Sequence, residues 1–181
     1  MFEAVREILP RRAQVSVDVN GGWSAQDAIA MSRWLADRGV DHIEQPLPRG
    51  RERQLPALRK KMALPIILDE SCRTQEDIPV LAGSCDGINI KLMKCGGPVE
   101  ALRMIHTAQA HGLRIMIGCY SNSALANTAG AHLGGWADYL DLDSHMNLTD
   151  DPFQGASLSR GRLDVSEKPG FGVSYEPPNK A

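Results

Sequence analysis

Residues 65–71 read PIILDES, a short run of apolar residues that ends in an acidic one, Asp69. The same pattern occurs twice earlier, in VSVDVN, which carries Asp18, and in DHIEQP, which carries Glu44. The three acids lie about 25 residues apart, which is the length of a parallel strand with its return helix. We therefore expect three neighbouring strands that each bring one carboxylate to the same rim of a sheet.

Outward from these runs, the chain alternates β-type runs with helical patterns. There are six β-type runs, and most of them contain Val or Ile: QVSVDV, DHIEQ, PIILDE, GINIKL, RIMIGC and YLDLD. The segment after the first run has a helix start signal, Ser24 followed by Asp27, and a stop signal, Gly39. Such regular alternation predicts a parallel sheet, either doubly wound or closed into a (β/α)8 barrel.

Two observations favour the barrel. Polar residues fall at the C-terminal end of almost every run, where a (β/α)8 barrel has its active site. The first run is also not followed by a GxGxxG or Walker turn, as in many nucleotide-binding doubly wound sheets. Because a barrel needs eight strands to close and six runs are present, we predict an incomplete (β/α)8 TIM-type barrel. Its strands three to eight occupy residues 1–150, and residues 151–181 form a C-terminal tail packed outside the barrel, with the last few residues disordered.

Composition excludes several classes of protein. The chain has 181 residues, 43% of them hydrophobic and 23% charged, which is ordinary for a soluble globular domain. A net charge of -2 gives no reason to expect a nucleic-acid or acidic-lipid partner. The apolar runs are too short to span a membrane, and the start does not resemble a secretory signal. The four cysteines form no CxxC pair, so we expect reduced thiols and a cytoplasmic protein.

Strand parity groups the polar residues. Side chains alternate along a strand, so Asp18, Glu44, Asp69 and Lys91 can all point inward at the top of the barrel while their apolar neighbours face the helices. A lone acid at a strand end is usually a turn residue or a helix cap. The shared position and period of three acids instead indicate a metal site, and an all-oxygen set suits Mg²⁺.

Lys91 lies inside an apolar strand, where it cannot easily reach water. It is expected either to lie near the carboxylates or to act as a base with a lowered pKa. Lys94, three residues further on, is interpreted as a loop or surface charge. Asp141 and Asp143 project to one face after the last run. They are strand-end turn residues, or ion-pair partners of an arginine, or a clamp for a substrate ammonium group.

These motifs resemble a known family. In order and spacing, DVNGGW, IEQP, LDES and INIKLMKCGG resemble the enolase superfamily, in its muconate-lactonizing-enzyme-like subgroup. The DLD motif of the last run resembles the dipeptide epimerases of the L-Ala-D/L-Glu epimerase type. The resemblance implies that Asp18, Glu44 and Asp69 bind Mg²⁺ and that Lys91 is an acid/base. It also implies that Asp141 and Asp143 hold the ammonium group of a dipeptide substrate.

The resemblance also shows what the chain lacks. The family's second catalytic lysine belongs to a KxK motif on an earlier barrel strand, and its N-terminal capping domain has no counterpart here. We therefore expect this chain to be a fragment that exchanges α-protons poorly and does not epimerise. Such an open sheet has two unpaired edges, which favour association into a homo-oligomer.

Several alternatives stay open. Within the superfamily they are muconate cycloisomerisation, o-succinylbenzoate synthesis and N-acylamino-acid racemisation. The substrates of these reactions have no free ammonium group. The pair Asp141 and Asp143 therefore argues against all three reactions. A non-catalytic truncated product, or a subunit that another chain completes, is a further alternative. A phosphate-binding barrel is disfavoured because the last two runs lack the Gly-rich loops of such sites.

Overall fold

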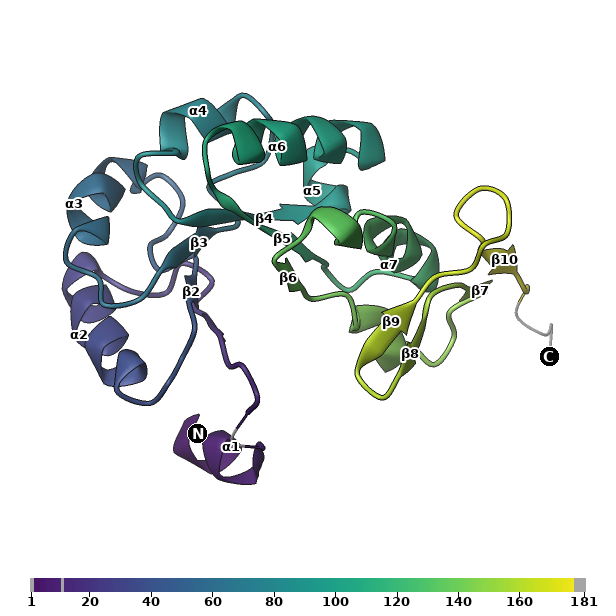
Figure 1. Ribbon diagram of the computed structural model, residues 1–181, viewed down its shortest axis with the longest axis horizontal. Helices are drawn as coiled ribbons and strands as arrows, with labels where there is room; N and C mark the ends of the chain where they lie inside the picture. Colours follow the sequence, from purple (N-terminus) through teal and green to yellow (C-terminus); the bar gives the residue numbers. More distant parts are fainter. Residues whose placement is uncertain (1, 11, 178–181) are drawn as a thin grey trace.

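The computed structural model describes residues 2–10 and 12–177. A parallel sheet of six strands, hydrogen-bonded in chain order, forms its centre. The strands are β1 (Val17–Asp18), β2 (Ile43–Glu44), β3 (Ile66–Leu68), β4 (Gly87–Lys91), β5 (Arg114–Gly118) and β6 (Tyr139–Leu140). The sheet curls into an open arc with helices on its convex side (Figure 1). The predicted incomplete barrel of six strand–helix units is confirmed, although most strands are shorter than the sequence runs.

Helices alternate with the strands, as the sequence pattern predicts, and one further helix was not predicted. They are α1 (Phe2–Ile8), α2 (Ala25–Ala36), α3 (Leu55–Arg59), α4 (Asp77–Leu81), α5 (Leu92–Cys95), α6 (Pro98–Ala110) and α7 (Ala124–Ala131), with the short 3₁₀ turns η1 (Glu52–Gln54), η2 (Gly134–Trp136) and η3 (Ser144–Asn147). Ser24 caps α2, because its hydroxyl accepts a hydrogen bond from the backbone N–H of Asp27. The helix that the sequence did not predict is α5, which begins directly after β4. No helix of the described chain is long and apolar enough to cross a membrane.

The main core lies between the sheet and the outer helices. Leu68, Ile88 and Ile90 are fully buried and belong to one cluster with Met104 and Ile105 of α6. These strand residues are the ones that parity assigns to the helix side, so burial of apolar surface determines which face of each strand turns outward. The polar residues between them are left to face the interior of the arc.

The C-terminal segment folds as two small antiparallel sheets. Strand β7 (Phe153–Gln154) pairs with β10 (Ser174–Tyr175), and β8 (Ser157–Ser159) pairs with β9 (Arg162–Asp164). The segment is joined to α7 at Thr128, whose hydroxyl accepts a 2.7 Å hydrogen bond from Ala156 N–H. The division at residue 150 stays a prediction, and the last few residues, predicted to be disordered, lie outside the described residues.

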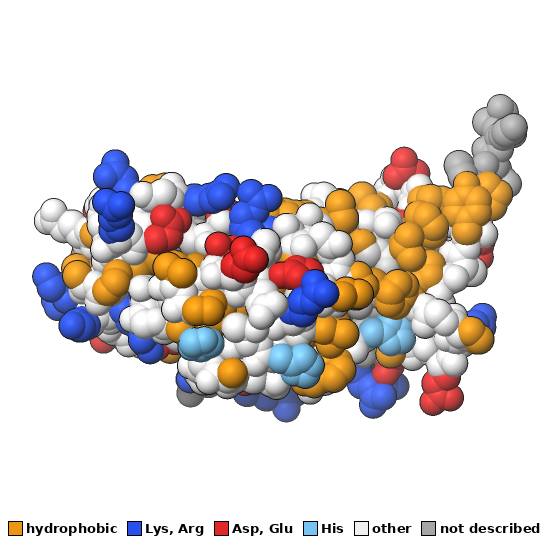
Figure 2. Space-filling model, turned by 90° about the horizontal axis from the view of Figure 1, so that it is seen from above, with side chains coloured by type: hydrophobic (Ala, Val, Ile, Leu, Met, Phe, Trp, Pro, Cys, Tyr) orange, Lys and Arg blue, Asp and Glu red, His pale blue; other side chains and the backbone are white. Residues whose placement is uncertain are grey.

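Charged residues of both signs are mixed on the helix-covered face, as the small net charge indicates. Figure 2 shows basic and acidic side chains side by side over the middle of this face. Hydrophobic side chains gather towards its C-terminal end. The visible face therefore has no large area of a single charge sign.

Candidate active site

The loops that follow β1 and β2 contact each other at the rim of the sheet. The backbone N–H of Gly21, at φ 70°, donates a 2.8 Å hydrogen bond to the carbonyl of Gln45. A Cβ at Gly21 would lie 2.8 Å from Pro48 Cα, so only glycine fits this contact without a shift. The NGGW and EQP motifs are therefore packing partners, and they hold the ends of β1 and β2 together.

The same two strands place two of the predicted carboxylates side by side. Asp18 of β1 and Glu44 of β2 are register partners in the parallel ladder. Asp18 is exposed, whereas Glu44 is buried and accepts a 2.7 Å hydrogen bond at Oε1 from Asn89 Nδ2 of β4. Asn89 has room to do this because its side chain lies against Gly118 of β5, where a Cβ would be 2.5 Å from Asn89 Oδ1.

Asp69, the third predicted carboxylate, lies in an ion-pair cluster just after β3. It is 1% exposed, and its Oδ2 lies 2.8 Å from Lys91 Nζ at the end of β4. Its Oδ1 is in contact with Lys94 Nζ. The prediction that Lys91 lies near the carboxylates is therefore confirmed.

The interpretation of Lys94 as a loop or surface charge is wrong. Its side chain is 2% exposed, and Nζ also donates to the backbone carbonyls of Asp69 (2.6 Å) and Asn89 (2.7 Å). Lys94 is buried because α5 starts immediately after Lys91 and forms about one helical turn. This turn returns Lys94 to the end of β3. The segment after Lys91 has no clear helix signal, so the sequence did not indicate this position.

Gln45 is a further site residue that the sequence did not identify. It has a positive φ of 36°, and its side-chain Oε1 accepts a 2.9 Å hydrogen bond from the backbone N–H of Asp69. Its Nε2 donates to the carbonyl of Leu47 and to the hydroxyl of Ser71. The Gln-Pro pair of the IEQP motif therefore connects the end of β2 to the backbone of Asp69.

The pKa values of Glu44 and Lys91 are both raised in this cluster. Burial, together with the charges of Asp18 and Asp69, raises the pKa of Glu44 to about 7. Burial alone would lower the pKa of Lys91, but the hydrogen bond and charge of Asp69 outweigh it and the pKa is raised. The alternative expectation, that Lys91 has a lowered pKa, is not met because acidic groups surround it.

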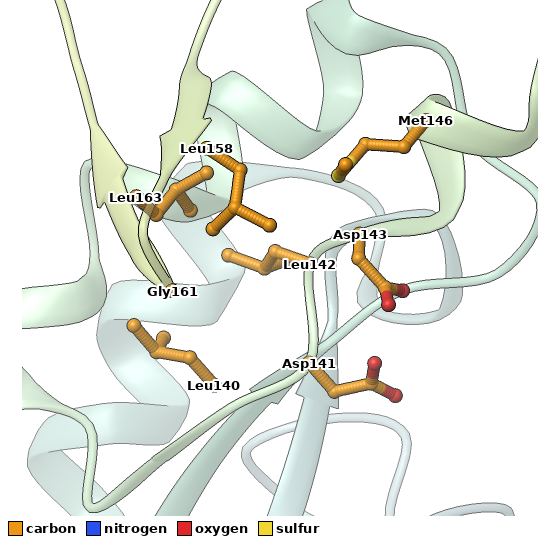
Figure 3. Close-up of a pocket in the computed structure, with 8 residues that line it drawn as sticks. All are labelled: Leu140, Asp141, Leu142, Asp143, Met146, Leu158, Gly161 and Leu163. Carbon is orange, nitrogen blue, oxygen red and sulfur yellow. The ribbon is translucent and has the colours of Figure 1, made fainter.

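Asp141 and Asp143 follow β6 on the other side of the arc. Both are exposed, and their carboxylates lie on the same side of the chain while Leu140 and Leu142 point the other way (Figure 3). Although Asp141 as a whole residue is exposed, partial burial of its carboxyl group is the main reason that its pKa is raised, and the charge of Asp143 adds to the effect. Among the described residues, these two carboxylates and the Cys119 thiol form the group of three potential metal ligands whose donor atoms all lie within 4.8 Å. Cys119 was not identified from the sequence.

A hollow extends from Asp18 and Glu44 to Asp141. It has a volume of about 520 Å³ and lies between β1 and β6, bordered by Asp18, Glu44 and Asp141 among others. His42 and Tyr139 form its lower part, with ring centroids 4.3 Å apart. The interior of the arc is thus a polar space large enough for a small substrate.

The donor chemistry of Asp18, Glu44 and Asp69 fits Mg²⁺. All three offer carboxylate oxygens, which are the hard ligands that this ion prefers. Their oxygens do not all lie within 4.8 Å of one another, and both oxygens of Asp69 face lysines. Asp69 Oδ2 faces the movable end of Lys91, so this oxygen can serve a cation once the ammonium group moves aside.

Comparisons with known proteins identify the family. A family model described as enolase C-terminal domain-like matches residues 1–179. The chain is 51% identical over 173 residues to a hydrophobic dipeptide epimerase of Roseobacter litoralis, covering 95% of this chain and 50% of that protein. The chain therefore spans about half the length of the curated relatives it matches.

Solved structures agree with this match. A dipeptide epimerase from Cytophaga hutchinsonii, complexed with Mg and D-Ala-L-Val, has a TM-score of 0.90 at 31% identity, covering 96% of this chain and 49% of that one. An N-succinyl Arg/Lys racemase from Bacillus cereus also has a TM-score of 0.90, at 29% identity, covering 96% of this chain and 48% of that one. Sequence and structure thus agree that this chain belongs to the enolase C-terminal domain-like family.

Proposed function

We propose that the chain carries the metal site, one acid/base residue and the ammonium clamp of a magnesium-dependent dipeptide epimerase. One observation carries the proposal: Lys91 Nζ lies 2.8 Å from Asp69 Oδ2 at the rim that also holds Glu44 and Asp18. This arrangement places a proton-transfer group beside a carboxylate cluster, two of whose members, Asp18 and Glu44, border the interior hollow. A substrate carboxylate at that cluster would have its α-carbon near Lys91.

Asp18, Glu44 and Asp69 would hold the metal. When bound, Mg²⁺ neutralises the negative charge that develops on the substrate carboxylate as the α-proton leaves. Lys91 would accept that proton, or return it, on one face of the α-carbon. To accept the proton Lys91 must be neutral, and to return it Lys91 must be protonated. The negative charges that raise its pKa favour the protonated state and oppose the neutral one. Neutralising the carboxylate cluster would therefore also favour the basic form of Lys91.

Asp141 and Asp143 would bind the substrate's free ammonium group. The two carboxylates have no hydrogen-bond partner among the described residues, and they lie on one side of the chain within reach of a common donor. A cation between them would relieve their mutual repulsion. This requirement favours a dipeptide with a free amino end. The 51% identity to a hydrophobic dipeptide epimerase favours apolar residues in that dipeptide.

Racemisation of N-acylated amino acids is the second candidate function. It is favoured by the structural similarity to the N-succinyl Arg/Lys racemase, which equals that to the dipeptide epimerase. The two candidates differ at one group: an N-acylated substrate has no ammonium to place between Asp141 and Asp143. The substrates of muconate cycloisomerase and o-succinylbenzoate synthase also have no ammonium group.

Binding to the chain separates the candidates. With Mg²⁺ present, apolar dipeptides and their N-acetylated forms are titrated by calorimetry. We expect at least tenfold weaker binding after acetylation, and equal or tighter binding of N-succinyl amino acids would support the second candidate instead. In D₂O, mass spectrometry should show slow Mg²⁺-dependent deuterium incorporation at the α-carbon that Lys91→Met abolishes.

Two sequence expectations remain proposals of the same kind. A cytoplasmic location is checked by cell fractionation. Assembly into a homo-oligomer through the open edges of the sheet is checked by size-exclusion chromatography with light scattering.

A further inference from the structure

Lys94 is a buried cation that the proposed reaction does not use. Its ammonium group faces three acceptors: the Asp69 carboxylate at Oδ1, the Asp69 carbonyl at 2.6 Å and the Asn89 carbonyl at 2.7 Å. A lysine ammonium has three N–H donors, so all of them are used. With 2% of its side chain exposed, Lys94 has neither the space nor a spare donor to move.

Lys91 is held much less firmly by the same carboxylate. Its side chain is 8% exposed, and among the described residues its ammonium has one hydrogen-bond partner, Asp69 Oδ2 at 2.8 Å. The ring of Tyr120, which is itself exposed, lies 4.8 Å away. The two oxygens of Asp69 therefore face two different lysines, one immobile and one able to leave.

We propose that Lys94 is a positioning residue that holds Asp69 by Oδ1, so that Oδ2 stays directed into the site for either Lys91 or a divalent cation. The inference rests on the proposed metal site. Because two positive charges at one oxygen repel each other, a cation at Oδ2 displaces the Lys91 ammonium. Metal binding and the release of Lys91 towards the substrate are then a single event, and Lys94 keeps the carboxylate in place through it.

The backbone supports the same assignment. The N–H of Asp69 is bonded to Gln45 Oε1 at 2.9 Å, and its carbonyl is bonded to Lys94. Both polar groups of the Asp69 backbone and one carboxylate oxygen are thus fixed by buried partners. The remaining oxygen, Oδ2, is the one that a ligand can compete for.

The inference is testable because two explanations predict opposite changes in cation affinity when Lys94 is replaced. One considers only the charge of Lys94, and the other its role in positioning Asp69. Lys91→Met and Lys94→Met each remove one positive charge that touches Asp69. If charge alone mattered, both variants would bind a divalent cation more tightly. If Lys94 positions Asp69, Lys91→Met binds more tightly because a competitor is gone, whereas Lys94→Met binds more weakly because the ligand is no longer oriented.

The experiment is Mn²⁺ binding to the wild-type chain and both variants, followed by electron paramagnetic resonance. We expect several-fold tighter binding for Lys91→Met and about tenfold weaker binding, or more, for Lys94→Met, as for other residues that orient metal ligands. Binding by Lys94→Met as tight as wild type would overturn the role of Lys94 and leave the metal site standing. No binding by the wild-type chain would overturn both.

A second measurement covers the case in which Lys94→Met does not fold, as judged by circular dichroism. The wild-type chain is labelled with ¹⁵N at the side-chain nitrogens of its six lysines. The Lys91 signal is assigned from its loss in Lys91→Met, and the Lys94 signal from its loss in the charge-conserving variant Lys94→Arg. On titration with Mg²⁺, the Lys91 signal should shift while the Lys94 signal stays in place. An equal shift of both signals would contradict the inference, because Lys94 would then move with the metal.

Discussion

The two sides of the site differ in how far the protein itself completes them. On the β3–β4 side, Asp69 is 1% exposed and both its carboxylate oxygens face buried lysines. On the β6 side, Asp141 and Asp143 are exposed, and neither carboxylate forms an ion pair with another described residue. A buried charge must be paired inside the protein, whereas an exposed one is stabilised by water until a ligand arrives. The first side is therefore built during folding, and the second is completed by substrate.

The largest effect should come from neutralising the buried side. Asp69→Asn would leave Lys91 and Lys94 buried without their shared countercharge. We expect the free energy of unfolding, measured in urea, to fall by about 3–5 kcal/mol. A loss below about 1 kcal/mol would show that the buried lysines are not held by Asp69, and the contrast between the two sides would disappear.

The next effect is a pH dependence from Glu44. Its pKa of about 7 lies above the ordinary value of 4.5, so folding favours its protonated form. The stability it contributes is fully present below pH 4.5 and is lost as pH rises through 7. The difference corresponds to about 3 kcal/mol in the free energy of unfolding.

The measurement compares wild type with Glu44→Gln, which cannot ionise, in urea at pH 4.5 and 7.5. The stability difference between the two proteins should change with pH in favour of the variant, and Mg²⁺ should offset this change for wild type at pH 7.5. A difference that stays constant over this range would mean that Glu44 ionises normally in the folded chain.

Asp141→Asn tests the exposed side through ligand binding. One carboxylate of the ammonium clamp becomes neutral, so we expect dipeptide binding to weaken by about 1.5–3 kcal/mol, roughly 10- to 150-fold, in calorimetry. The N-acetylated dipeptide is the matched control, because its binding should not depend on Asp141. An equal loss for both ligands would remove the assignment of Asp141 to the ammonium group.

The smallest effect is on stability at the exposed side. Asp143→Asn removes a negative charge beside Asp141, and repulsion from Asp143 contributes to the raised pKa of Asp141. We expect the free energy of unfolding to rise slightly, by up to about 0.5 kcal/mol, as is usual at exposed positions. Thermal melting at low salt provides the measurement. A destabilisation of several kcal/mol would make this side structural, like the one around Asp69.

The main features of the curled sheet could be predicted from the sequence alone. The six strands, their order and the inward direction of Asp18, Glu44, Asp69 and Lys91 depend on local patterns of period two and on a repeat of about 25 residues. Burial of Leu68, Ile88 and Ile90 against α6 enforces those patterns. Such signals are local in the chain, so one sequence suffices to read them.

The pairing of charges could not be predicted in this way. Lys94 comes three residues after Lys91 in the sequence, in a segment without a clear helix signal, yet α5 returns it to the end of β3. Asn89, Gln45 and Cys119 likewise join the site through contacts between different strands. None of these contacts leaves a periodic trace in the sequence.

The sequence by itself determined the kind of sheet, the family and the acids at its rim, because hydrophobic periodicity and strand-end motifs are properties of neighbouring residues. Only the tertiary structure decided which charges are paired, which stay in water, and that one carboxylate faces two lysines. These are matters of distance and burial, and both are set when strands distant in the chain pack side by side.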